Sequence, residues 1–438
     1  MRSLDRKLNL WAVSLSGVGV ILGAGIYALI GPAADEAGNA MWASFAIAAV
    51  IAGLTALTYA RFVRMRPKNS PEFQYATLGF GPRIGFTAGW LMIWADLVSV
   101  GAVAIGFGGY LESVTPITVV AGAVLLIGAA AVLAWWGIGE SIRIVVAFTL
   151  LEVGGLVFII LIGVPHWGSV DYLATPRGFS GVWAASALIF FAYLGFDELG
   201  NLAEEAKQPE RTLPIALAIA FLVSSVIYVG VAVSAASAIG WERLAGSTAP
   251  LGEVARIALG GNARIVLTLI ALAATANTVL LLLIAGSRAL QGMAEAKALP
   301  AWLGRIGARR TPWAALIVTT VIAVAFALIG DLERVARITN AAILLSFAVV
   351  NFALVRHLAR VRAALSARTV VTDYLLPATA GICCLALLAY TGVEGIAWAL
   401  GLGVAGLLVG GWLGPRADSS RTPHASSPGV TGSSRTPG

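Results

Sequence analysis

Charged residues are scarce in this sequence of 438 residues. Asp, Glu, Lys and Arg make up 12% of the chain, whereas hydrophobic residues make up 59%. The charged share is about half of the roughly 25% that is usual in soluble domains, so these side chains cannot cover a surface exposed to water. The composition therefore predicts an all-α polytopic membrane protein, because helices satisfy their own backbone hydrogen bonds in lipid.

Cysteine and histidine are equally sparse. Cys383 and Cys384 are adjacent within an apolar run, which suits two small buried thiols better than a disulfide framework. The three histidines stand at positions 166, 357 and 424, and neither His-Glu-x-x-His nor Gly-x-Ser-x-Gly occurs. We expect no enzymatic activity, no metal site and no cofactor.

Long apolar runs, by contrast, recur along the whole chain. A helix needs about 20 such residues to cross the hydrocarbon core. Twelve runs qualify as predicted spans: 9–33, 40–63, 84–111, 117–136, 142–164, 181–202, 213–238, 264–290, 313–330, 334–356, 373–391 and 396–414.

The basic residues orient these spans. If residues 1–8 lie in the cytoplasm, 23 of the 29 lysines and arginines fall on cytoplasmic segments. Such a bias predicts that both termini are cytoplasmic and that the protein lies in the cytoplasmic membrane. The net charge of +7 is then a topology signal and a contact with anionic lipid, not a nucleic-acid site. Residues 415–438 have too few apolar side chains to form a core and should form a disordered cytoplasmic tail.

Glycines interrupt the first span at mid-membrane depth, in the segment from Gly17 to Tyr27. Each glycine weakens a helix by about 1 kcal/mol relative to alanine. The cluster indicates an unwound segment, which lipid tolerates only beside protein or a water-filled cavity. The alternative is close helix packing through Gly19-x-x-x-Gly23.

The sixth span carries a matching interruption from Phe190 to Asp197. Paired interruptions in two halves of a chain point to a transporter site at the bilayer midplane. The two interruptions fall at corresponding places in two successive sets of five spans. Free N–H groups at such breaks attract a carboxylate and free C=O groups attract an ammonium, so an amino acid or related amine fits.

Three separated strings resemble the amino acid–polyamine–organocation (APC) superfamily, and most closely its bacterial amino acid permeases and cationic amino-acid transporter relatives. They are GVILGAGIYALIGP from Gly19, FFAYLGFDELGNLAEEAKQPERTLP from Phe190, and the pairs Ser287-Arg288, Leu299-Pro300 and Thr311-Pro312. The resemblance implies a fold of five plus five inverted spans with discontinuous first and sixth helices. The inverted repeats would then be 9–164 and 181–356, and the two spans in 373–414 would be accessory. It does not extend to Pro67–Phe73, where the family usually has Pro-x-x-Gly-Gly-x-Tyr.

The resemblance also implies roles for residues at the two breaks. The N–H groups that would bind the substrate carboxylate belong to Gly23, Ala24 and Gly25. The carbonyls that would bind the ammonium belong to Ile21, Phe191, Ala192 and Leu194. Phe191 or Tyr193 would close over the substrate as an aromatic gate.

Acidic residues inside spans are expensive and suggest function. The resemblance places Glu152 where several proton-coupled family members carry a lysine beside the first span. We hypothesise that Glu152 carries the coupled proton; a packing role or a substrate contact is the alternative. Asp197 would bind a cationic side chain or hold the half-helices in register. Asp96 would face the cavity or form a hydrogen bond.

The predicted function is secondary active transport by proton symport. The alternative is an exchanger or a uniporter of the same fold. A different class of function, a channel or a non-transporting receptor, is also open. The substrate would be selected by side chains on the third, sixth, eighth and tenth spans. The sequence leaves open which of these reach the cavity: Asp96, Ser99, Tyr193, Asn277 or Asn340.

Overall fold

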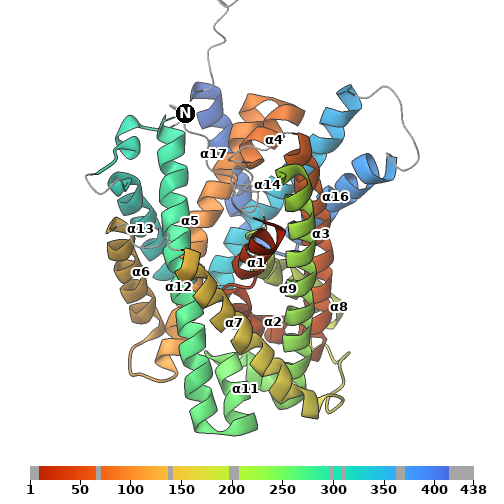
Figure 1. Ribbon diagram of the computed structural model, residues 1–438, viewed down its shortest axis with the longest axis vertical. Coiled ribbons are helices and arrows are strands. Elements are labelled where there is room, and N and C mark those ends of the chain that lie inside the picture. Colours follow the sequence, from red (N-terminus) through yellow and green to blue (C-terminus); the bar gives the residue numbers. More distant parts are fainter. Residues whose placement is uncertain are drawn as a thin grey trace, which may run out of the picture.

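The computed structural model describes residues 9–65, 71–136, 142–196, 207–295, 299–307, 311–361 and 370–413. Each regular element in these ranges is helical, and the helices form one bundle (Figure 1). The predicted all-α polytopic fold is confirmed. The predicted N-terminal segment, Asp197 and the predicted disordered tail lie outside the described residues.

Each of the twelve predicted spans coincides with a helix or a pair of helices. The first five correspond to α1 and α2 (Leu10–Ile21 and Gly25–Ala37), α3 (Met41–Met65), α5 (Pro82–Glu112), α6 (Val119–Trp135) and α7 (Ile142–Gly163). The next five correspond to α8 with the 3-10 turn η3 (Gly178–Ile189 and Phe190–Tyr193), α9 (Pro209–Ile239), α12 (Gly261–Glu295), α13 (Trp313–Ala327) and α14 (Leu332–Val361). The last two correspond to the π-helical turn η6 with α16 (Val371–Leu375 and Leu376–Leu388) and to α17 (Gly392–Leu413).

Within the described ranges, length and hydropathy alone qualify eight helical segments to cross a membrane, one of which runs from α2 through α3. The segments Val119–Trp135, Gly178–Tyr193 and Trp313–Ala327 are shorter but also apolar. Short elements connect the spans: η1 (Gly38–Ala40), α4 (Pro71–Phe80), η2 (Val164–His166), α10 (Trp241–Ala245), α11 (Pro250–Leu259) and η5 (Ala301–Gly304). Helices α4 and α11 mark opposite ends of the bundle (Figure 1).

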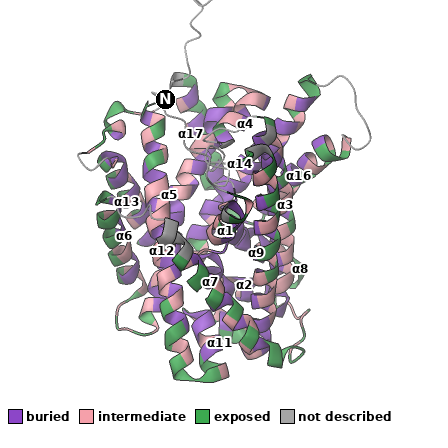
Figure 2. Cartoon of the chain, in the orientation of Figure 1, coloured by how far each residue is buried: buried purple, intermediate pink, exposed green. Residues whose placement is uncertain are grey.

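Burial follows the position of each helix in the bundle. Helices α5 and α14 pack against each other and have mostly buried residues. Exposed residues gather on the peripheral helices α6 and α13 (Figure 2), and they include large apolar side chains such as Leu125 and Val321. An apolar perimeter of this kind suits a lipid solvent rather than water.

Candidate functional site

The first span is broken where the glycines predicted it. Helix α1 ends at Ile21 and α2 begins at Gly25, so three residues between them are not helical. Ala24 is the N-cap residue of α2 and supplies no side-chain cap. Its own N–H donates to Thr278 Oγ1 at 3.3 Å. The break therefore exposes carbonyls at the end of α1 and N–H groups at the start of α2.

The sixth span is interrupted in a different way. Helix α8 tightens into η3, and the chain turns extended at Leu194. Gly195 follows with φ of 101°, a conformation that side chains with a Cβ disfavour. The Leu194 N–H donates to the Phe191 carbonyl at 3.2 Å. The remaining residues of this span, from 197 on, lie outside the described ranges.

The two breaks contact each other directly. A Cβ on Gly25 would lie 2.6 Å from Ala192 Cα, and one on Gly195 would lie 2.4 Å from Val20 Cγ1. Glycine at both positions lets the backbones approach to a distance that no side chain would allow. The first and sixth spans thus meet at their interruptions, as the paired breaks predict.

Tyr228 of α9 is hydrogen-bonded to both breaks. Its hydroxyl lies 2.5 Å from the Ile21 carbonyl oxygen and 2.9 Å from that of Ala192, and the residue is fully buried. A phenol has a single proton, which it shares between these two acceptors. Each carbonyl therefore keeps acceptor capacity for a further donor such as an ammonium group.

A cavity lies between the breaks and helices α5, α7 and α12. Seven of the eight predicted binding residues line it: Ile21, Gly23, Ala24, Gly25, Phe191, Ala192 and Leu194. Its polar side chains come from neighbouring helices: Asp96, Ser99, Thr149, Glu152, Asn277 and Thr278. Met92, Val103 and Leu281 are among its apolar lining residues.

Tyr193 and Asn340 do not line this cavity. The Tyr193 hydroxyl donates to the Phe45 carbonyl at 3.1 Å, and its ring packs against Tyr228. The Asn340 side-chain amide donates to the carbonyls of Ala187 and Leu188. Both residues therefore support the helices around the cavity, and Phe191 is the aromatic residue of η3 that faces it.

Glu152 occupies the junction of α7 with the broken first span. The residue is 1% exposed, and its Oε1 has no hydrogen-bond partner among the described residues. Asn277 lies within hydrogen-bonding reach of the carboxyl group, and Tyr27 of α2 donates to the Glu152 backbone carbonyl at 2.8 Å. One turn earlier, Thr149 packs against Gly19 of α1. A buried carboxyl oxygen without a hydrogen-bond partner is energetically costly, and protonation or a hydrogen bond from a bound molecule would remove that cost.

Tyr228, Thr149 and Thr278 belong to the site but are absent from the residues predicted for it. Tyr228 carries the single phenol of the predicted span 213–238, whose other side chains are apolar apart from four serines. A phenol at membrane depth needs a polar partner, so this tyrosine could have been identified from the sequence as a residue that bonds to another helix. Which partner it takes depends on contacts across 207 and 36 residues of sequence, which periodicity does not reveal.

We expect Tyr228→Phe to fold and to be less stable than the parent. Phenylalanine keeps the ring packing but leaves the buried carbonyls of Ile21 and Ala192 without their donor, at a cost of roughly 1–3 kcal/mol. The melting temperature of the purified protein should fall by a few degrees. The matched control is Tyr75→Phe, because the buried Tyr75 hydroxyl has no hydrogen-bond partner among the described residues. A melting temperature of Tyr228→Phe that equals the parental value would remove the bridging role.

Among the described residues, no group of three or more His, Cys, Asp and Glu side chains is arranged to hold a metal ion. The chemistry available at the cavity is therefore that of helix ends, hydroxyls, one amide and two carboxyl groups.

Comparison with known proteins gives concordant matches. Residues 8–400 match the amino acid permease family. An uncharacterized transporter of Mycobacterium tuberculosis is 32% identical over 357 residues, covering 80% of this chain and 79% of the relative. The branched-chain amino acid permease BcaP of Bacillus subtilis is 29% identical over 388 residues, covering 81% of each chain. The vacuolar cationic amino acid transporter 4 of Arabidopsis thaliana is 30% identical over 378 residues, covering 79% of this chain and 62% of the relative.

Proposed function

Because this chain belongs to the amino acid permease family, we propose that it is a secondary active transporter that binds its amino acid between the two helix breaks. The observation that carries the proposal is the direct contact of the breaks beside a cavity lined by both. Similar relatives are named as transporters or permeases.

The substrate carboxylate binds at the start of α2. The N–H groups of its first turn have no intrahelical acceptors, Ala24 supplies no side-chain cap, and the helix dipole favours an anion there. The ammonium binds on the opposite side, at the carbonyls of Ile21 and Ala192 that share the Tyr228 proton. Both charges of a zwitterion are thus matched by backbone groups, which leaves its side chain to the variable walls of the cavity.

The side chain of the substrate meets mixed walls. Apolar residues such as Met92 and Val103 accept a neutral side chain, while Asp96 and Glu152 accept a donor. The relatives named for branched-chain and for cationic amino acids span the same range. The substrate class is therefore an amino acid or a related amine.

Transport proceeds by alternating access between two inverted repeats, residues 9–164 and 181–356, with 373–414 as accessory helices. Both termini are cytoplasmic, so α4 lies at the cytoplasmic end of the bundle and α11 at the outer end. The distribution of lysine and arginine along the sequence supports this orientation.

Glu152 carries the coupled proton in a symport cycle. Its depth, its free carboxyl oxygen and its bond from Tyr27 of α2 support this role, and Thr149, one turn earlier, packs against Gly19 of α1. A proton that enters the cavity satisfies the carboxyl group, and the Tyr27 bond joins this residue to α2, where the substrate carboxylate binds. Binding of the proton and binding of the substrate would then both affect the break between α1 and α2.

Uptake by purified protein in liposomes tests the proposed function. With an inward proton gradient, at least one member of a panel of neutral and cationic amino acids should accumulate with saturable kinetics. Addition of a protonophore should remove the accumulation while leaving exchange intact. If no amino acid or amine in the panel is taken up above empty liposomes, the proposal fails.

A further inference from the structure

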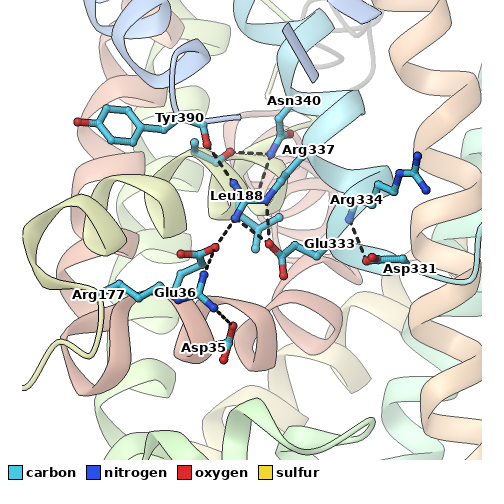
Figure 3. Close-up of polar contacts among 11 residues, drawn as sticks. Asp35, Glu36, Arg177, Leu188, Asp331, Glu333, Arg334, Arg337, Asn340 and Tyr390 are labelled. Carbon is cyan, nitrogen blue, oxygen red and sulfur yellow. Dashed lines mark hydrogen bonds and ion pairs between the residues drawn. The ribbon is translucent and has the colours of Figure 1, made fainter. Parts of the chain in front are cut away.

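Five charged residues gather at the α11 end of the bundle. Asp35 and Glu36 lie in the last turn of α2, Arg177 precedes α8, and Glu333 and Arg337 lie near the start of α14. Figure 3 shows both arginines directed at the Glu36 carboxylate. We refer to these five residues as the outer cluster.

Glu36 is the hub of the outer cluster. Its Oε1 accepts from Arg177 Nη1 at 2.7 Å and from Arg337 Nη2 at 2.6 Å. The Glu36 side chain is only 8% exposed and that of Arg337 16%, so this pair is largely removed from water, whereas Arg177 is about half exposed. One carboxylate thereby holds α2 to the segment before α8 and to α14 at the same time.

Further bonds brace the two arginines. Arg177 also pairs with Asp35 at 2.5 Å, and Arg337 pairs with Glu333 at 2.7 Å. Burial alone would lower the pKa of Arg177, but the attraction of Glu36 and Asp35 outweighs it and raises that pKa, so the guanidinium stays charged. Arg337 Nη1 donates to the Tyr390 carbonyl at 3.0 Å, which connects the outer cluster to the turn between α16 and α17.

An apolar layer separates the outer cluster from the cavity. Along α2, α8 and α14 the buried side chains of Leu29, Leu188 and Ile338 stand between the charged residues and the lining residues. The backbones are as close as their atoms permit, because a Cβ on Gly181 of α8 would lie 2.2 Å from the Glu36 carbonyl oxygen. A solute can reach the cavity from this end only if α2, α8 and α14 separate.

We propose that Glu36, held by Arg177 and Arg337, is the latch that keeps the outer entrance of the cavity closed. The inference rests on the proposed carrier function and orientation, and adds the device that sets the balance between outer-closed and outer-open states. Opening must break both ion pairs of one carboxylate together. In Glu36→Gln, Arg177 keeps its pair with Asp35 and Arg337 keeps its pair with Glu333. The carboxylate between the two guanidinium groups is lost, and with it the ion pair that joins α2 to α14, which favours the open state.

The test measures access to Leu188 from outside. Leu188→Cys is introduced as a reporter after both native cysteines are replaced by serine, and a membrane-impermeant methanethiosulfonate reagent is added to the outer side. Glu36→Gln should raise the labelling rate about tenfold, as expected for a shift of the resting equilibrium toward the open state. Arg337→Gln should act in the same direction, which covers the case that one variant folds poorly.

The matched control is Glu253→Gln, at the same end of the bundle. Glu253 pairs with Arg256 at 2.5 Å within α11, so its removal breaks an ion pair that joins no separate helices. Its labelling rate should stay within about twofold of the parent. Unchanged labelling in folded Glu36→Gln and Arg337→Gln proteins, or an equal rise in Glu253→Gln, would overturn the latch. The measurement needs no substrate, so failure of the latch and failure of amino acid transport are separate results.

Discussion

Gly25→Leu protein that is correctly inserted should show no measurable amino acid uptake. Even one carbon at this position would lie 2.6 Å from Ala192 Cα and 2.9 Å from Ala192 Cβ, so the backbone of one break must move away from the other. The N–H groups at the start of α2 would move with it. A displacement of about 1 Å at such a site can cost about 100-fold in rate, and leucine adds a bulkier clash than that.

The matched control for this substitution is Gly128→Leu. Gly128 lies on the exposed side of α6, and no atom lies within 4 Å of a Cβ placed there. Both variants add the same apolar side chain to a helix in the membrane, but only one adds it between the breaks. Uptake by Gly128→Leu should stay within about twofold of the parent. Uptake by Gly25→Leu at the parental rate would show that the breaks do not form the site.

Glu152→Gln should abolish proton-driven accumulation while retaining exchange of substrate. Glutamine resembles the protonated carboxyl in shape but cannot release a proton, so the coupled step is lost. A gradient of one pH unit stores about 1.4 kcal/mol per proton, which supports about tenfold accumulation. In the parent protein, uptake should rise as the outer pH falls, whereas in Glu152→Gln it should not change with pH. Isotope uptake at several outer pH values measures both.

A comparison with Asp96→Asn makes the Glu152 result specific. Asp96 lines the same cavity and undergoes the same change from carboxyl to amide. Whatever its transport rate, this variant should keep the dependence on pH. If Glu152→Gln also keeps its full pH dependence, the coupled proton resides elsewhere.

The helices and the two breaks were predictable because their signals are local. Runs of apolar residues give the spans, and the glycines around Gly23 and Gly195 mark the positions where helix formation is least favourable in free energy. The resemblance to the superfamily is confirmed by the match over residues 8–400. The sequence segments that carry this resemblance, from Gly19 and from Phe190, also contain the residues of the breaks that line the cavity.

Side-chain direction within η3 was harder to predict. A 3-10 turn has three residues per turn, so residues two apart point to different sides. Phe191 therefore faces the cavity while Tyr193 points to Phe45. The predicted aromatic gate named both residues, and the sequence alone gave no reason to choose between them.

The partners of buried polar groups were not predictable at all. Asn340 bonds to carbonyls more than 150 residues away, and Glu36 pairs with Arg337 across 301 residues. Such pairings depend on how helices are arranged in the bundle, which composition and periodicity do not specify. Glu36 lies near the end of a predicted span, where an acidic residue is usually exposed to water.

Counterflow in liposomes tests the central claim most directly. Liposomes containing the parent protein and loaded with an unlabelled amino acid should transiently accumulate the labelled form above its outer concentration, because one saturable site alternates between the two sides. Gly25→Leu, reconstituted at the same density, should show no such overshoot. An equal overshoot in both proteins, or non-saturable equilibration without overshoot in the parent, would contradict a carrier site at the paired breaks.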